Sequence, residues 1–244
     1  MSDSYKEFLR QQRSNVEKSS VLRAYFHSVY SQIATQISGL QRVLEVGAGA
    51  GISGIFLDQK ILRTDYFPFP EFDVLGNCPA ENLPFEDSHF EALFLVDALH
   101  HVTNLEMSFN EFIRVVSPGG KIVIFEPWVS FLSYFPYKLF HHESTSWKLN
   151  QTWRYTSNDP SDGNQGVSRF IVNNKEFSNR FKGDLKTSQI TYMSPFSFYL
   201  TGGVSKPSQF SERFLNRIIK FESKIPQIFL KLTAARVLIT MNVI

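Results

Sequence analysis

The sequence contains a single cysteine, Cys78, among its 244 residues. One thiol cannot form a disulfide within the chain, and it cannot supply the sulfur ligands of a cysteine-rich zinc site. No run approaches the ~20 apolar residues that a membrane-spanning helix needs. The polar residues 1–20 lack the apolar stretch of a signal peptide, and we interpret them as a polar arm or a frayed helix. These absences predict a protein of the reducing cytoplasm.

The net charge is small as well, +2 at pH 7, which does not indicate nucleic-acid binding. Its distribution is uneven, because the segment from Lys206 onward carries seven basic residues and two acidic ones. Two interpretations stay open for a basic helix in this segment. It packs on the sheet with a solvated outer face, or it makes a peripheral contact with an anionic membrane.

Phenylalanine is abundant, with 24 residues beside 9 tyrosines and 3 tryptophans. Aromatic side chains dominate most protein cores, so an aromatic-rich core is the first interpretation. An aromatic-lined pocket or a membrane-facing surface is the alternative.

Apolar runs and helical patterns alternate along the first half of the chain, which is typical of a parallel, doubly wound sheet. A turn is expected at Ser117–Gly120. The patterns predict helices over residues 21–37, 52–59 and 104–116, and strands over residues 42–46, 61–64, 72–75, 90–96 and 121–125.

The alternation stops after Glu126. Residues 127–188 hold a cluster of aromatic side chains and a polar, turn-rich stretch, and a connection of that length is usually functional. We interpret it as a cap inserted over the site. The last two strands are expected at 190–200 and 236–243, with a helix over 209–224 whose apolar residues share one stripe, namely Phe210, Phe214, Ile218, Phe221 and Ile225.

The fold prediction is therefore an α/β, Rossmann-like, doubly wound and mostly parallel seven-stranded sheet, with a cap inserted after the fifth strand. We expect one domain over residues 1–244. Its cofactor half spans about 21–126, its cap about 127–188, and its C-terminal strands and helix about 189–244.

A glycine-rich loop, Gly47 to Gly51, follows the first strand. Glycine lets the backbone approach a ligand closely, and the helix after such a loop points free N–H groups at the same place. Asp65 ends the next strand and suits the two hydroxyls of a ribose. Residues 49–54 also satisfy the dinucleotide fingerprint G-x-G-x-x-G, so the loop alone leaves a nicotinamide or flavin site open, and a purely structural turn as well.

Three further segments resemble one family in order and spacing. Glu45 precedes the glycines as in an E/D-x-G-x-G-x-G loop, and residues 80–87, AENLPFED, resemble an AExLPFxD segment. Leu99–Val102 and Ser117–Gly120 complete the set. Over residues 41–126 the chain resembles the class I S-adenosylmethionine-dependent methyltransferases of the ubiquinone and sterol type (type 11) branch.

The resemblance implies S-adenosylmethionine as the cofactor and assigns roles around it. Asp97 would face the methyl-transfer site, and Pro79 stands where the family commonly has an aspartate for the adenine amino group, which weakens the assignment of Glu81. The implied roles are the methionine portion for Gly47, Ala48, Gly49 and Gly51, the amino group for Glu45, the ribose for Asp65, and the adenine for Ala80 and Glu81.

A hydroxyl acceptor benefits from a general base. The candidates are His100, His101, His141 and His142, with Asp97 beside them, although either histidine of the first pair also suits simple packing. The spacing of these residues matches no standard ligand motif, so no metal is expected.

A second resemblance involves Glu126–Glu143 and Gly163–Gly166, which look like a bacterial subgroup encoded beside cell-surface polysaccharide and glycolipid genes. It implies a saccharide or lipid-linked acceptor. The sequence thus predicts a methyltransferase acting on a small-molecule, glycan or lipid-linked acceptor, with O-methylation by in-line transfer. A nicotinamide-dependent oxidoreductase and a non-catalytic methyltransferase-like binding protein are the alternatives.

Overall fold

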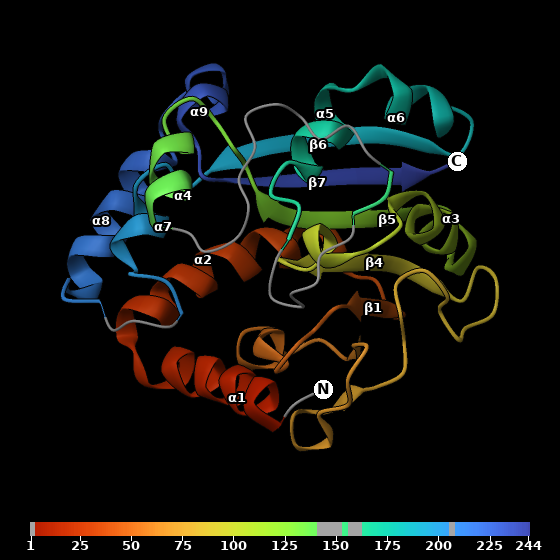
Figure 1. Cartoon of the computed structure of the whole chain (residues 1–244), viewed down its shortest axis with the longest axis horizontal. Coiled ribbons are helices and arrows are strands. Elements are labelled where there is room, and N and C mark those ends of the chain that lie inside the picture. Colours follow the sequence, from red (N-terminus) through yellow and green to blue (C-terminus); the bar gives the residue numbers. More distant parts are fainter. Residues whose placement is uncertain (1–2, 141–152, 156–162, 205–207) are drawn as a thin grey trace.

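The computed structural model describes residues 3–140, 153–155, 163–204 and 208–244 (Figure 1). At its centre lies a seven-stranded sheet in the order β3-β2-β1-β4-β5-β7-β6. The strands are β1 (Val43–Val46), β2 (Ile61–Thr64), β3 (Val74–Leu75), β4 (Phe90–Val96), β5 (Val116–Pro127), β6 (Leu185–Met193) and β7 (Arg236–Val243).

Strands β1 to β5 run parallel to one another, and β7 inserts antiparallel between β5 and β6. The carboxyl ends of the five parallel strands therefore meet at one edge of the sheet, together with the start of β7. This arrangement confirms the predicted Rossmann-like, mostly parallel seven-stranded fold.

Helices surround the sheet, and in the ranges given above three short 3-10 helices lie in its connections. The α-helices are α1 (Asp3–Lys18), α2 (Ser20–Ile37), α3 (Leu105–Val115), α4 (Tyr134–Phe140), α5 (Val167–Asn173), α6 (Lys175–Arg180), α7 (Ser197–Leu200), α8 (Glu212–Glu222) and α9 (Gln227–Thr233). The 3-10 helices are η1 (Ile52–Ile55), η2 (Pro70–Phe72) and η3 (Leu99–His101).

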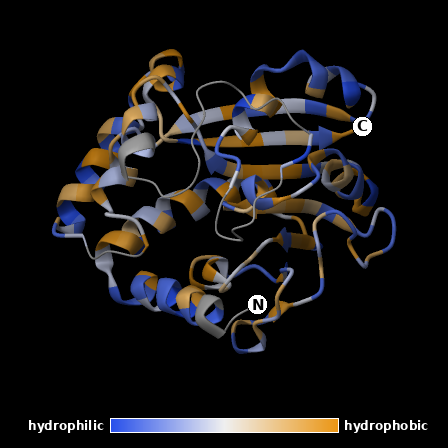
Figure 2. Ribbon diagram, viewed as in Figure 1, coloured by the Kyte–Doolittle hydropathy of each residue, from blue (hydrophilic) through white to orange (hydrophobic). Residues whose placement is uncertain are grey.

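The two faces of the sheet belong to two separate cores, because successive side chains of a strand point to opposite faces. In β4, Leu93 and Leu95 pack with α3, α5 and α6, whereas Ala92 and Phe94 pack with α2 and with Leu215 of α8. Both faces are thus covered, which explains why the central strands are apolar throughout. Figure 2 shows these apolar strands at the centre of the molecule.

Several predicted elements need correction. The helix expected over 52–59 is only the single turn η1, since Gly51 enters it in the left-handed conformation and Phe56 N–H bonds to Ser53 in the 3-10 pattern. The third strand, expected over 72–75, contains only the two residues of β3, because η2 extends to Phe72. The expected turn at 117–120 is an irregularity within β5, where Val116 pairs with Phe90 and Lys121 pairs with Ala92.

The C-terminal half differs more. The strand expected at 190–200 begins at Leu185 and ends at Met193, because Ser194 takes a left-handed φ of 59° and turns the chain into α7.

Two helices also differ from their predictions. Residues 1–20, interpreted as an arm or a frayed helix, contain the regular helix α1. The predicted helix 209–224 is α8, but its buried side chains are Leu215 and Glu222, not the phenylalanine stripe.

Candidate cofactor and acceptor site

The glycine loop leaves β1 at the carboxyl edge of the sheet, where its glycines face different surroundings. A Cβ at Gly47 would lie 2.5 Å from the Cβ of Ala98, so this position is closed by protein. Gly49 has a φ of 53°, and no atom lies within 4 Å of the place its Cβ would take. The loop is therefore packed at Gly47 and open at Gly49, which leaves space for a ligand against its backbone.

Asp65, at the end of β2, closes this loop with its carboxylate. Oδ2 accepts a hydrogen bond from Gly49 N–H at 2.8 Å, and Oδ1 accepts one from Phe67 N–H at 3.0 Å. Burial raises the pKa of Asp65, and these backbone bonds oppose the shift. Because a carboxylate oxygen accepts more than one hydrogen bond, the predicted ribose contact is compatible with this geometry and stays a prediction.

Glu45 is buried beneath the loop. Its Oε2 accepts a hydrogen bond from the Ser53 hydroxyl and lies 3.7 Å from Nε of Arg63. Burial raises the pKa of Glu45 to about 7, although Ser53 and Arg63 lower it. The carboxylate therefore joins β1, β2 and η1, and the expected contact with the cofactor amino group stays a prediction.

Arg13 of α1 was missed by the sequence analysis. Its Nη1 donates to the carbonyls of Ala50 and Gly51 at 2.9 and 2.6 Å, and its guanidinium lies 4.5 Å from the centre of the Phe72 ring. The first helix thus holds the outer side of the glycine loop. A polar helix pattern gives no signal for such a contact, which spans 37 positions of the chain.

The segment that contains Ala80 and Glu81 lies beside Asp65, because Cys78 N–H donates to the Asp65 carbonyl at 3.1 Å. Ala80 is half-buried against the core. The Glu81 carboxylate accepts hydrogen bonds from Thr103 and from Asn104 N–H, and so holds the start of α3. The predicted adenine contacts therefore depend on the backbone here, and they stay predictions.

The remainder of this segment is held by Arg114 of α3. Its guanidinium donates to the carbonyls of Leu83 and Phe85 and to the carboxylates of Asp87 and Glu111. Two acidic side chains of the AENLPFED segment, Glu81 and Asp87, thus have structural partners in the fold.

Asp97 ends β4 with a left-handed φ of 49°, which turns its half-buried side chain toward the start of β7. There Oδ1 accepts a hydrogen bond from Nη1 of Arg236 at 2.7 Å, and the Arg236 guanidinium lies 4.0 Å from the centre of the Phe198 ring. Burial raises the pKa of Asp97, whereas Arg236 lowers it. The pair places one anion and one cation at the edge where the acceptor was predicted to bind.

His100 and Glu126 form a second hydrogen-bonded pair at this edge. Nδ1 of His100 lies 2.5 Å from Oε2 of Glu126, and both side chains are buried. The other oxygen of Glu126 accepts from the N–H groups of Ala98 and Leu99 at 2.9 and 2.6 Å. Burial raises the pKa of Glu126 to about 7, and these bonds lower it.

Glu126 was not among the predicted site residues. The signal that was available is a carboxylate directly after the apolar strand residues 121–125. His101, the neighbour of His100, is exposed, unlike His100. Its ring centre lies 4.1 Å from that of His100. His141 and His142 lie outside the described residues.

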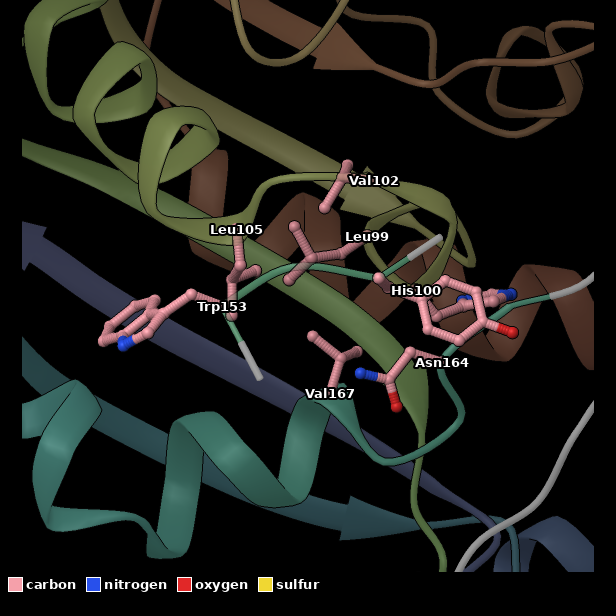
Figure 3. A pocket seen from close by; sticks show the side chains of 8 residues that line it. Leu99, His100, Val102, Leu105, Trp153, Asn164 and Val167 are labelled. Atoms are coloured by element: carbon pink, nitrogen blue, oxygen red, sulfur yellow. The ribbon is translucent and has the colours of Figure 1, made fainter. Parts of the chain in front are cut away.

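A small pocket lies between η3 and the described part of the cap (Figure 3). His100 and Asn164 border it on one side and Trp153 on the other. Asn164 N–H donates to the His100 carbonyl at 2.8 Å, and Leu105 N–H donates to the Trp153 carbonyl at 2.8 Å. Two separate pieces of the predicted cap thus contact η3 and the first residue of α3.

The aromatic side chains after Glu126 serve different purposes. Trp128 is buried against Tyr192, and its indole N–H donates to the Lys231 carbonyl at 2.9 Å, so it packs the fold. Trp153 packs in the same manner against Phe170 and Phe177. Phe131 and Phe135, by contrast, are exposed.

No group of three histidine, cysteine, aspartate or glutamate side chains suited to a metal ion occurs within the described ranges. In the same part of the chain, no helix is long and apolar enough to cross a membrane.

Comparison with known proteins gives matches over the glycine loop and the parallel strands. Residues 44–124 match the family described as "Methyltransferase domain". The ubiquinone/menaquinone biosynthesis C-methyltransferase UbiE of Pseudomonas fluorescens is 26% identical over 129 residues, which cover 43% of this chain and 50% of that protein. The chain therefore spans about half the length of the curated relatives it matches.

Solved structures share the fold. An S-adenosylmethionine-dependent methyltransferase from Thermotoga maritima superposes with a TM-score of 0.56 at 17% identity, covering 98% of this chain and 97% of that one. The geranyl diphosphate C-methyltransferase of Streptomyces coelicolor, in complex with S-adenosyl-L-homocysteine, reaches 0.51 at 13% identity over 89% and 77% of the two chains. The sheet order, the loop at its carboxyl edge and these matches agree: residues 44–124 are similar to a methyltransferase domain, and the chain shares its fold with S-adenosylmethionine-dependent methyltransferases.

Proposed function

We propose that this protein transfers a methyl group from S-adenosylmethionine to a small-molecule acceptor and that the acceptor atom is a hydroxyl oxygen. The observation that carries the proposal is the buried His100–Glu126 pair at the same sheet edge as the glycine loop. When bound, the cofactor supplies an electrophilic methyl group, so the protein chiefly has to align a nucleophile and remove its proton.

The residues that would hold the cofactor are those of the glycine loop and its supports. The open side of Gly49 gives the ligand access to the backbone, and the Asp65 carboxylate lies directly beside it. Ala80 follows in the segment that is hydrogen-bonded to Asp65 through Cys78. Together these features fit a nucleoside with an attached amino acid.

His100 is our candidate for the group that accepts the proton. The carboxylate of Glu126 at Nδ1 favours the tautomer whose basic nitrogen is Nε2. Glu126 is a positioning residue, since it also fixes the backbone of η3 through Ala98 and Leu99. His101 and Asp97 remain neighbouring candidates, and His141 and His142 stay predictions.

The nature of the acceptor is also part of the proposal. The exposed phenylalanines of the segment after Glu126 suit stacking on a sugar or contact with a lipid chain, which supports a saccharide or lipid-linked acceptor. Because the chain also matches C-methyltransferases of ubiquinone and menaquinone biosynthesis, a carbon atom is the alternative acceptor to test.

The oxidoreductase alternative is less well supported. A dinucleotide site needs the N-terminus of a regular helix for its pyrophosphate, whereas the four residues after Gly51 form only η1. Calorimetric titration with S-adenosylhomocysteine and with NADH separates the two functions. We expect binding of the former alone, and binding of NADH alone would refute the methyltransferase proposal.

Transfer of labelled methyl from the cofactor to fractionated extracts, followed by mass spectrometry, tests the reaction itself. We expect a product that gains one methyl group on oxygen. A His100→Gln variant should bind S-adenosylhomocysteine normally and lose turnover. Turnover that survives in this variant, or a C-methylated product, would contradict hydroxyl deprotonation by His100.

A further inference from the structure

Exposed phenylalanine is confined almost entirely to one part of the molecule. Seven of the eight exposed phenylalanines in the described ranges follow residue 130, and all seven belong to α4, α7, α8, α9 or their connections. Ile228 is 74% exposed, Phe131 66% and Phe229 61%. Isolated apolar side chains on a surface need no explanation, but a concentration of this kind marks an interaction site.

Hydrogen bonds connect these elements to one another. Leu132 N–H, just before α4, donates to the Leu232 carbonyl of α9 at 3.2 Å. The Glu222 carboxylate of α8 accepts from the N–H groups of Phe196 and Ser197 at the start of α7. Figure 1 shows the four helices gathered at the left of the molecule, beyond the carboxyl ends of β4 and β5. Figure 2 shows apolar residues on the same helices.

Helix α8 presents its side chains in three stripes, because residues three, four or seven positions apart point in similar directions. Leu215 and Glu222 are buried against the fold. Phe214 and Phe221 lie seven positions apart on the flank, and the ring of Phe210 stacks on Phe214 with centres 5.4 Å apart. These are the three phenylalanines of the stripe that the sequence pattern singled out, and all three are exposed, whereas Ile218 and Ile225 of that stripe are half-buried.

The third stripe of α8 is basic and adjoins the phenylalanines. Arg213, Arg217 and Lys220 each stand next to or one turn from Phe214 or Phe221, and all three are exposed. Lys224 and Lys231 continue the positive charge toward α9, beside Ile228, Phe229 and Leu232. Among the described residues, none of these five cations forms an ion pair.

We propose that this apolar–basic face, defined by the exposed side chains of residues 131–135 and 210–232, docks on an anionic lipid bilayer. Aromatic side chains that reach the acyl boundary, with cations beside them at the level of the headgroups, are the combination that binds negatively charged membranes. The proposal does not depend on methyl transfer. If the proposed function also holds, docking would bring the carboxyl edge of the sheet close to the membrane.

The positive charge of the apolar–basic face argues against a second copy of the chain as the partner that binds there. A symmetric dimer would bring the same patch of both copies together, and the five cations would then face five others. Only Glu212 offers an exposed carboxylate within α8. A bilayer rich in phosphatidylglycerol supplies the complementary charge without that repulsion.

Sedimentation with vesicles tests this proposal on the complete chain. We expect binding to vesicles of equal parts phosphatidylcholine and phosphatidylglycerol, weak binding to phosphatidylcholine alone, and partial release at high salt. Replacing three cations, in Arg217→Gln/Lys220→Gln/Lys224→Gln, should weaken binding by about a hundredfold. Replacing two apolar side chains, in Phe221→Ser/Phe229→Ser, should weaken it by about tenfold or more.

Matched controls come from another part of the molecule. Lys182→Gln/Lys186→Gln removes exposed cations near the start of β6, and Met107→Ser removes an exposed apolar side chain from α3. Both should bind vesicles as the wild type does, and circular dichroism checks the fold of every variant. Equal binding by all variants would overturn the proposal. So would a stable dimer in lipid-free solution that the phenylalanine variant abolishes in analytical ultracentrifugation.

Discussion

His100 and Glu126 share a hydrogen bond of 2.5 Å between Nδ1 and Oε2, at the end of two neighbouring parallel strands. The other oxygen of the same carboxylate receives two backbone N–H groups, so one side chain orients the imidazole and the turn that carries it. Different replacements of Glu126 can therefore test its effect on the orientation of the imidazole separately from its effect on folding.

Glu126→Gln should preserve the fold and lower the rate of methyl transfer by about tenfold or more, since an amide at this position favours the other imidazole tautomer. Glu126→Ala should in addition destabilise the protein by roughly 2–4 kcal/mol, because it leaves buried N–H groups without an acceptor. Turnover assays, thermal unfolding and 15N spectra of the histidine ring measure these effects.

Glu91→Gln is the matched control. Glu91 also accepts two backbone N–H groups, those of Gln41 and Arg42, but at the amino edge of the sheet. Normal turnover in Glu126→Gln, or an equal loss in Glu91→Gln, would exclude a positioning role for Glu126.

The buried Glu45 should make stability depend on pH. Its pKa is about 7 in the folded protein against an ordinary value of 4.5, so the folded state holds the proton more tightly. Glu45 therefore stabilises the protein fully at pH values below its pKa in the unfolded chain. This stabilisation is lost as the pH rises through the pKa of Glu45 in the folded protein. Relative to Glu45→Gln, the free energy of unfolding of the wild type should fall by roughly 2.5 kcal/mol between about pH 5 and about pH 8.

Urea unfolding across this range measures the difference, and taking it relative to Glu45→Gln cancels the parallel titration of Glu126. Glu91→Gln should leave the slope in this range unchanged, because hydrogen bonds from Gln41 and Arg42 lower the pKa of Glu91. A difference between wild type and Glu45→Gln that does not vary with pH would contradict the raised pKa.

The glycines of the loop should respond differently to alanine. Gly49→Ala costs about 1–2 kcal/mol for the left-handed backbone, but its methyl group enters open space, so the fold should survive. Because that space adjoins the expected cofactor, the affinity for S-adenosylhomocysteine should fall by about tenfold or more. Gly47→Ala collides with Ala98 and should lower the unfolding temperature far more.

Gly119→Ala is the matched control, because it introduces the same kind of backbone strain away from the expected cofactor site. Gly119 has a φ of 81° and open space around its Cβ position, but it lies at the amino end of β5. Its variant should bind the cofactor product as the wild type does. Equal affinities for Gly49→Ala and Gly119→Ala would place the cofactor elsewhere.

Arg13→Ala should reduce affinity for S-adenosylhomocysteine by about three- to tenfold, because the carbonyls of Ala50 and Gly51 lose the guanidinium that holds them. Arg10→Ala is the control on the same helix, where the arginine pairs with the exposed Glu71 instead. Calorimetry compares the two variants. A loss that is equal in both would indicate a general effect of α1 on stability rather than support of the loop.

The parts of the fold that sequence patterns predicted well are the buried ones. The strands at residues 90–96 and 236–243 were placed at their observed bounds because both are apolar on two faces. β6 was displaced because it is the edge strand, whose Lys186 and Gln189 are exposed and break the apolar pattern. The missed residue Arg13 acts through a contact between distant segments, which local spacing cannot indicate. Glu126 did have a local signal, its place directly after strand residues 121–125, but its partners Ala98, Leu99 and His100 come from a distant segment.

The contact of α1 with the glycine loop has a thermodynamic consequence. Since Arg13 joins the helix to carbonyls that border the ligand space, docking of the helix and occupation of that space are coupled equilibria, and each must favour the other by the same factor. Amide hydrogens of residues 6–18 should consequently exchange more slowly when S-adenosylhomocysteine is present, so the first helix becomes a reporter of ligand binding.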